Sequence, residues 1–182
     1  MKKVLILLLS STMFFASGCK GLSHDFKSYT FRNLSLKYPK SMELAGEEVF
    51  PDKDFVSFFL TDKADRKSKI EFGISEFAKD FLKTVPDEEL MGELAAEVDE
   101  MQKNTLVVED IEVLEQTEIL WSEKPSSPEA YSFYRIREGN EIIYMSFSAK
   151  VVGNYCVCSI CRSGDPSTME LFNNVLDSLN NS

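Results

Sequence analysis

The chain has 182 residues, of which 20 are Lys or Arg and 30 are Asp or Glu, giving a net charge of −10. Its length suits one domain, and 43% hydrophobic with 27% charged residues is the composition of a globular protein. The excess of acid argues against nucleic acid as a partner, because binding a polyphosphate depends on Lys and Arg. A single histidine, His24, leaves little material for acid–base catalysis at neutral pH. We therefore predict that the protein is not an enzyme.

Residues 1–18 are predicted to be a cleaved signal peptide. Lys2 and Lys3 form a basic start, residues 4–15 are mostly apolar, and three small residues precede Cys19. The apolar run is shorter than the roughly 20 residues that span a bilayer. Small residues before a cysteine resemble the lipobox of bacterial lipoproteins. The alternative is ordinary cleavage, or an uncleaved anchor, with Cys19 incidental.

The lipobox resemblance implies that Cys19 carries diacylglycerol on its sulfur and an acyl chain on its new amino group, with residues 19–27 as a tether. No other cofactor is expected. Several acyl chains make a firm anchor, at about 0.8 kcal/mol per buried CH₂. The resemblance also implies a place in the bacterial cell envelope, on the periplasmic side. The outer membrane is favoured, because Lys20 stands where an Asp would favour retention in the inner membrane.

The first half of the mature chain is predicted to be rich in strands. Alternating or continuous apolar residues indicate four strands, at residues 29–31, 34–38, 55–60 and 70–74. The first two form a hairpin closed by Pro39. The third is nearly all apolar, which favours a strand covered on both faces. The acid-rich stretches around Glu47-Glu48 and residues 52–54 are predicted to be loops.

A helix is predicted from about Thr84 to Asn104. Thr84 is a candidate N-cap, Pro86 lies in the first turn, and residues 87–89 are acidic, as suits the positive end of a helix dipole. Apolar residues recur at helical spacing on one face: Leu90, Met91, Leu94, Ala95, Val98 and Met101. This stripe predicts an amphipathic helix lying on a sheet.

The second half is predicted to contain more strands and a final helix. An apolar segment from Ile111 to Trp121 precedes a Pro-rich break. Strands are then expected at residues 130–137, 142–152 and 155–161. The two-residue turns between them, 139–140 and 153–154, make these strands an antiparallel meander. Asp165 and Pro166 begin the helix, whose apolar stripe is Met169, Phe172, Val175, Leu176 and Leu179.

Together these elements predict a single α+β domain over residues 28–182, with a mainly antiparallel sheet flanked by two amphipathic helices. An aromatic-rich hairpin ending in Tyr38-Pro39, a mid-chain helix, a three-strand meander and a short C-terminal helix follow in that order. This order is similar to the PsbP-like fold, an α/β/α sandwich of photosystem accessory proteins and bacterial envelope lipoproteins. The resemblance implies a role in binding proteins and transfers no catalytic residues.

Three cysteines lie close together in the sequence: Cys156, Cys158 and Cys161. Three thiolates so close could bind Zn²⁺ or Cu⁺. In a strand, however, Cys156 and Cys158 point to one face and Cys161 to the other. A Cys156–Cys158 disulfide is disfavoured, because extended side chains two residues apart exceed the roughly 3.8 Å Cβ spacing that a disulfide needs. Buried apolar thiols are the main interpretation, with metal binding or redox chemistry as alternatives.

Two acidic clusters could serve glycoside hydrolysis or Ca²⁺ binding. One is residues 87–89, and the other comprises Glu109, Asp110, Glu112, Glu115 and Glu118. No Gly-punctuated Asp loop accompanies them, so we predict solvated acidic faces with no metal.

Trp121 and Tyr131 are the candidate interface residues, because Trp and Tyr often anchor protein interfaces. Trp121 could instead close one end of the core. The leading hypothesis is a non-enzymatic, membrane-tethered module that binds an envelope protein. The alternatives are a thiol-based metal or redox protein, and a carrier of a small ligand in a helix–sheet cleft.

Overall fold

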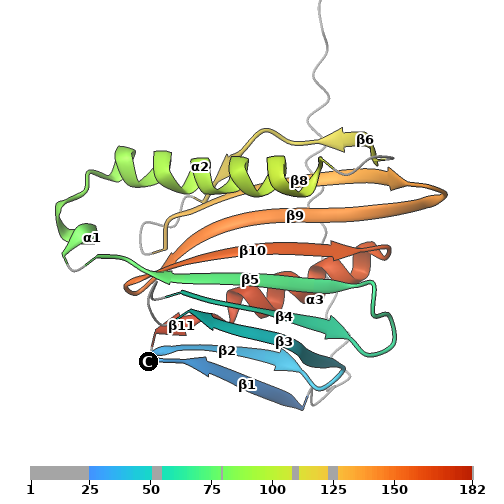
Figure 1. Ribbon diagram of the computed structural model, residues 1–182, viewed down its shortest axis with the longest axis horizontal. Helices are drawn as coiled ribbons and strands as arrows, with labels where there is room; N and C mark the ends of the chain where they lie inside the picture. Colours follow the sequence, from blue (N-terminus) through green and yellow to red (C-terminus); the bar gives the residue numbers. More distant parts are fainter. Residues whose placement is uncertain (1–24, 51–54, 79, 108–110, 123–126, 182) are drawn as a thin grey trace, which may run out of the picture.

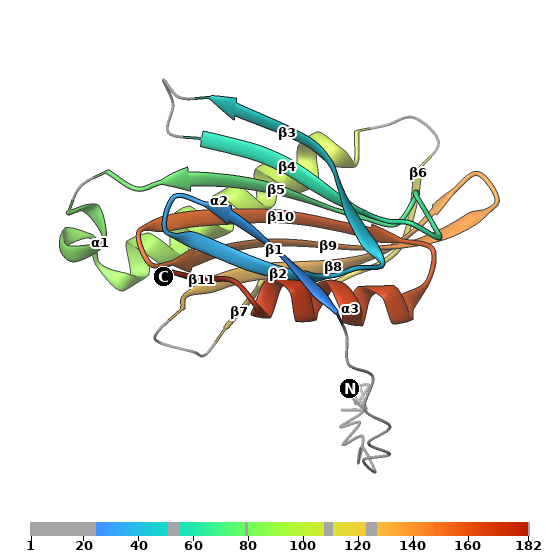
Figure 2. The same cartoon turned by 90° about the horizontal axis from the view of Figure 1, so that it is seen from below.

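The computed structural model describes residues 25–50, 55–78, 80–107, 111–122 and 127–181. They form three layers (Figures 1 and 2): helix α2 (Asp87–Thr105), a central eight-stranded sheet, and a layer that contains helix α3 (Pro166–Asp177) and a small sheet. Every strand pair in the described residues is antiparallel. The predicted α+β class with a mainly antiparallel sheet is confirmed.

The central sheet has the strand order β3-β4-β5-β10-β9-β8-β6, with short β7 beside β8. Its strands are β3 (Met42–Phe50), β4 (Phe55–Asp62), β5 (Lys69–Glu76), β6 (Ile111–Gln116), β7 (Leu120–Trp121), β8 (Glu129–Glu138), β9 (Glu141–Val152) and β10 (Tyr155–Ser163). Strands β8, β9 and β10 are the predicted meander. Gly139 and Gly153 open its two turns with φ angles of 58° and 60°, a conformation that glycine adopts without steric cost.

One hydrophobic core lies between the central sheet and the layer of α3. The small sheet closes this core and consists of β1 (Phe26–Phe31), β2 (Leu34–Pro39) and β11 (Asn180–Asn181). Alternate side chains of β4 and β5 fill it, namely Val56, Phe58, Leu60, Ile70, Phe72 and Ile74. Phe172 and Val175 of α3 pack on them. Asp165 is the N-cap of α3 as predicted, because its carboxylate accepts a hydrogen bond from the Ser167 backbone N–H at 2.9 Å.

The second core lies on the other face, under α2. Leu90, Leu94 and Val98 are the buried residues of this helix, as the apolar stripe predicted. They pack in one cluster with the inward side chains of β8 and β9, among them Ala130, Tyr134, Ile136, Ile143, Met145, Phe147 and Ala149. Burying a side chain of this size contributes about 1.5–3 kcal/mol. These buried side chains stabilise the packing of one helix on each face of the sheet.

The predicted loop around Glu47-Glu48 is wrong, because both residues belong to β3. Within the described part of the chain, this strand pairs with β4 alone and forms an edge of the sheet. Acidic side chains suit an edge strand, where charge opposes pairing with another chain. Residues 52–54, the other predicted loop, lie outside the described residues.

The predicted N-cap of the long helix is also wrong. Thr84 ends a separate one-turn helix, α1 (Phe81–Thr84), where its hydroxyl donates to the carbonyls of Asp80 and Phe81 at 3.2 Å. Pro86 is the N-cap of α2, and no side chain caps it. Thr84 cannot cap α2 because its hydroxyl already bonds back to the preceding turn.

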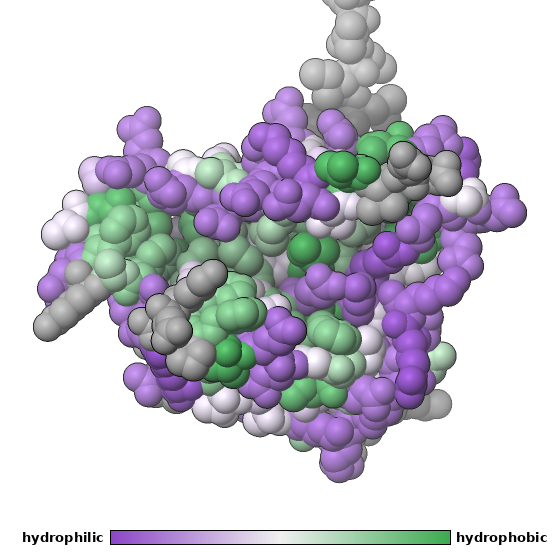
Figure 3. Space-filling view, in the orientation of Figure 1, coloured by the Kyte–Doolittle hydropathy of each residue, from purple (hydrophilic) through white to green (hydrophobic). Residues whose placement is uncertain are grey.

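Strand β4 is covered on one face rather than both, which corrects a third prediction. Phe58 is 1% exposed in the first core, whereas Phe59 next to it is 37% exposed on the other face. That second face belongs to α2, but the helix packs mainly on β8 and β9. We call the uncovered part, bearing Phe50, Phe55 and Phe59, the open face. Figure 3 looks onto the open face and shows apolar side chains in the hollow between α2 and the β3–β4 hairpin.

Candidate functional site

Cys19, the predicted lipid attachment residue, lies outside the described residues, as does His24. The domain starts a few residues later, because β1 begins at Phe26, inside the predicted tether of residues 19–27. Asp25 is fastened to the domain: its carboxylate accepts from Lys40 Nζ at 2.8 Å, and its carbonyl accepts from the Lys40 backbone N–H at 3.0 Å. Across the described ranges, no helix is both long and apolar enough to cross a bilayer.

Trp121 and Tyr131 lie in paired strands but on opposite faces of the sheet. Leu120 is directly opposite Tyr131, and Trp121 is opposite Ala130. Directly paired residues share a face. Leu120 therefore lies beside Tyr131 on the face of α3, whereas Trp121 lies on the face of α2. Trp121 is 41% exposed.

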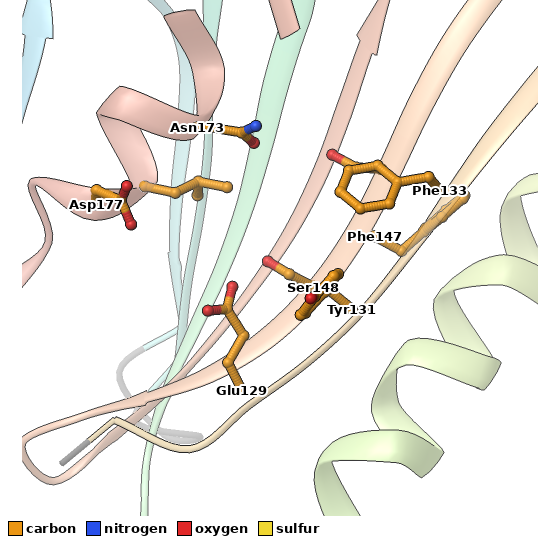
Figure 4. Close-up of a pocket in the computed structure, with 9 residues that line it drawn as sticks. Glu129, Tyr131, Phe133, Phe147, Ser148, Asn173 and Asp177 are labelled. Carbon is orange, nitrogen blue, oxygen red and sulfur yellow. The ribbon is translucent and has the colours of Figure 1, made fainter. Parts of the chain in front are cut away.

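Tyr131 lines a groove between β8–β9 and α3, which we call the α3 groove (Figure 4). The groove has a volume of about 310 Å³. Strand residues lining it include Glu129, Tyr131, Phe133, Ser146 and Ser148, and helix residues include Asn173, Leu176 and Asp177. The Tyr131 and Phe133 rings meet edge to face, with centroids 5.6 Å apart. The groove thus combines aromatic surface, hydroxyl groups and two carboxylates.

Ion pairs border the groove on β6 and β8. Arg135 Nη2 lies 2.6 Å from Glu115 Oε1, and Arg137 pairs with Glu112. Exposed pairs of this kind contribute only about 0–1 kcal/mol each. Of the second predicted acidic cluster, Glu109 and Asp110 lie outside the described residues. The first cluster, residues 87–89, forms the first turn of α2.

The three cysteines divide between the two faces of β10, as strand alternation predicted. Cys156 and Cys158 lie with the α2 core, and Cys161 lies in the other core. All three are free thiols. The Sγ atoms of Cys156 and Cys158 are 3.9 Å apart, and Glu97 Oε2 of α2 is 3.9 Å from the Cys158 Sγ.

Two of these thiols, Cys158 and Cys161, have raised pKa values. The interaction with Cys156, burial and the Glu97 carboxylate together raise the pKa of Cys158 far above its usual range. Burial raises the pKa of Cys161 to about 12. Since the thiolate is the nucleophile, neither group is activated for redox attack at neutral pH. Among the described residues, no three His, Cys, Asp or Glu side chains are grouped to hold a metal ion.

Sequence reasoning missed several residues of the groove. Phe133 lines the groove and is 39% exposed, whereas Leu120, 40% exposed and paired with Tyr131, is not one of its lining residues. Phe133 has the same parity as Tyr131 in its strand, so alternation alone could have grouped the two. Asn173 and Asp177 of α3 carry no such signal, because only the packing of the helix brings them opposite β8.

A solved structure shares this arrangement. The solution structure of cyanobacterial PsbP (CyanoP) from Synechocystis sp. PCC 6803 matches with a TM-score of 0.57 and 12% identity, covering 92% of this chain and 98% of that one. The fold is PsbP-like. PA94 of Pseudomonas aeruginosa, a protein of unknown function, matches with a TM-score of 0.34 and 8% identity over 84% of this chain and 91% of that chain. This second match is too distant to carry an argument.

No protein-family model matches the sequence, and neither does any curated protein. An identity of 12% shows the fold alone. Because one fold hosts many functions, the role of this PsbP-like domain has to be argued from its own surface.

Proposed function

We propose that this protein is a non-enzymatic lipoprotein of the bacterial cell envelope whose PsbP-like domain binds another envelope protein through the α3 groove. Lipid on Cys19 holds the domain at the membrane on its periplasmic side, with the outer membrane favoured. The observation that carries the proposal is the aromatic wall of the groove opposite α3, made by the half-buried Tyr131 and the exposed Phe133.

The chemistry of the groove indicates what it would bind. Aromatic anchors in a partly enclosed site supply much of the binding energy of protein interfaces. A partner side chain inserted between Phe133 and Leu176 would be desolvated on both of its sides. Glu129 and Asp177 provide carboxylate oxygens near it. An apolar or aromatic side chain next to Lys or Arg therefore fits, and the net charge of −10 steers a basic surface towards this domain.

The tether and the groove complement each other. Stable complexes usually bury about 800 Å² on each partner, so a groove of about 310 Å³ would supply only the centre of an interface. The exposed side chain of Leu120 extends the apolar surface beside it. Confining both proteins to one membrane raises their effective concentration, which compensates for a small interface.

Site-specific photocrosslinking in intact cells tests the proposal. A photoreactive amino acid replaces Phe133 in the full-length protein, and a matched probe replaces Val49, which is 52% exposed on β3 away from the groove. We expect one envelope protein to be captured from position 133 and not from position 49. Tyr131→Ala should weaken that capture, and Cys19→Ser should weaken it by removing the anchor.

Two results would count against the proposal. If both probes capture the same proteins, or if Tyr131→Ala leaves capture unchanged, the groove is not the interface. If position 133 captures no protein but native mass spectrometry finds a small molecule that is lost in Phe133→Asp, the groove is instead a carrier site. Its volume is at the lower limit of the roughly 300–1,000 Å³ typical of small-molecule pockets.

A further inference from the structure

Cys156 and Cys158 form a converging pair of thiols on the face of the sheet opposite the α3 groove. A strand advances by about 6.6 Å over two residues, yet the two sulfur atoms are only 3.9 Å apart. The side chains therefore lean towards each other. Extended residues this far apart along the strand do not reach the roughly 3.8 Å Cβ spacing of a disulfide, so a bridging atom fits better than a direct S–S bond.

The separation of the sulfur atoms is within the reach of a bridging metal ion. Two metal–sulfur bonds of about 2.3 Å, the length of a Zn–S bond, span at most about 4.6 Å. Structural Zn²⁺ requires four ligands, and no group of three His, Cys, Asp or Glu among the described residues is placed to hold a metal ion. Thiolates select soft ions such as Cu⁺. Cu⁺ also accepts near-linear two-coordinate geometry, for which the two sulfur atoms would move apart by up to about 0.7 Å.

One of the two thiols reaches the surface, and the surroundings favour positive charge. Cys158 is only partly buried, whereas Cys156 is 7% exposed. Gly73 is directly opposite Cys158 on β5, and a Cβ at Gly73 would lie 3.3 Å or less from the nearest ring atoms of Phe55 and 3.9 Å from the Cys158 Cβ. The Phe55 ring of the open face therefore packs on Gly73 next to Cys158. The Glu97 carboxylate adds negative charge at 3.9 Å.

We propose that Cys156 and Cys158 are a two-thiolate site for a soft monovalent metal ion, Cu⁺, entered from the open face. On binding, both S–H bonds break, two Cu–S bonds form, and two protons pass to solvent, leaving a complex of net charge −1. There is no change of oxidation state. The Glu97 carboxylate, 3.9 Å from the Cys158 sulfur, attracts the cation. Cys161 takes no part, because it lies on the other face.

Competition with a chromophoric Cu⁺ chelator under anaerobic conditions measures the site in the detergent-solubilised full chain. Every protein carries Cys19→Ser, so that only the thiols of β10 respond. We expect one Cu⁺ per chain. Loss of an outer-shell partner usually costs about 10–100-fold in metal affinity, so Glu97→Gln should weaken binding about tenfold and Cys156→Ser or Cys158→Ser by more than 100-fold. Cys161→Ser is the matched control and should bind as the parent does.

X-ray absorption of the Cu⁺ complex should report two sulfur neighbours. The proposal is overturned if the parent takes no Cu⁺ from the chelator, or if Cys158→Ser binds like the parent. It is also overturned if Cys161→Ser, folded by circular dichroism, loses as much affinity as Cys158→Ser. Should Cys156→Ser fail to fold, the partly exposed Cys158 and Glu97 positions still decide the result. Phe133→Asp should leave Cu⁺ binding unchanged, which separates this site from the α3 groove.

Discussion

Adjacent phenylalanines in β4 should differ sharply in their contribution to stability. Phe58 is 1% exposed, and its ring lies 4.7 Å from Phe72 and 4.1 Å from Tyr29, centroid to centroid. Removing a buried phenylalanine side chain costs about 3–5 kcal/mol, and each lost ring pair accounts for about 0.5–1.5 kcal/mol beyond its buried area. We expect Phe58→Ala to lower the free energy of unfolding by about 4 kcal/mol.

Phe59→Ala is the matched comparison. Its ring is 37% exposed and rests on Gly46, where a Cβ would lie 2.3 Å from a ring atom. A fully buried phenylalanine is worth about 1.5–3 kcal/mol in transfer free energy, so a partly exposed one should cost about 1–2 kcal/mol. Urea unfolding of the detergent-solubilised chain, followed by far-UV circular dichroism, measures both values.

Equal losses for the two variants would refute this reasoning. That result would mean that something covers β4 on both faces, as its apolar run suggested, and that the open face does not exist in solution. If Phe58→Ala is too unstable to fold, Phe58→Leu and Phe59→Leu should keep the same order of stability.

Two further predictions concern single hydrogen-bonded groups. Gln102 of α2 donates to the buried Ser132 hydroxyl and accepts from the Tyr134 hydroxyl at 3.0 Å, so Gln102→Ala should cost about 1–3 kcal/mol in urea unfolding. The neighbouring Lys103→Ala removes only an exposed ion pair and should cost less than about 0.5 kcal/mol; similar costs for both would contradict this. Hydrogen bonds from the Ser167 hydroxyl and backbone N–H lower the pKa of Asp165 in the folded state. The Asp165 carboxylate therefore stabilises the fold fully above the ordinary Asp pKa of about 3.9, and this stabilisation is lost as the pH falls through the lower pKa of the folded state. The difference in Tm between the parent and Asp165→Ala should therefore shrink on acidification below about pH 4, and a difference that is constant down to pH 2 would exclude this role.

Local sequence signals predicted the elements whose ends are marked by turn or capping residues. The turns at Gly139 and Gly153 define the meander, and Asp165-Pro166 begins α3, because each involves only neighbouring residues. The apolar stripe of α2 predicted its buried residues for the same reason. Strand alternation also placed Cys156 and Cys158 on one face and Cys161 on the other.

The candidate sites needed more than local signals. The sequence pattern grouped Trp121 with Tyr131, but strand pairing puts Leu120 beside Tyr131 and turns Trp121 to the other face. For the thiols, alternation separated Cys161 from the other two, but only the structure adds Glu97, 61 residues away from Cys158 in the chain, to the Cys156–Cys158 pair.

By itself, the sequence determined the α+β class, the order of most elements, the two helix stripes and the alternation of the thiols, because these depend on periodicity and turn chemistry within a few residues. Only the tertiary structure decided that β3 is an edge strand, that β4 is covered on one face and that α3 faces Tyr131 across a groove. Those features depend on which distant segments meet. An apolar strand can pack against a helix, a second sheet or solvent without any change in its own residues, so the partner of each face is a property of the folded chain.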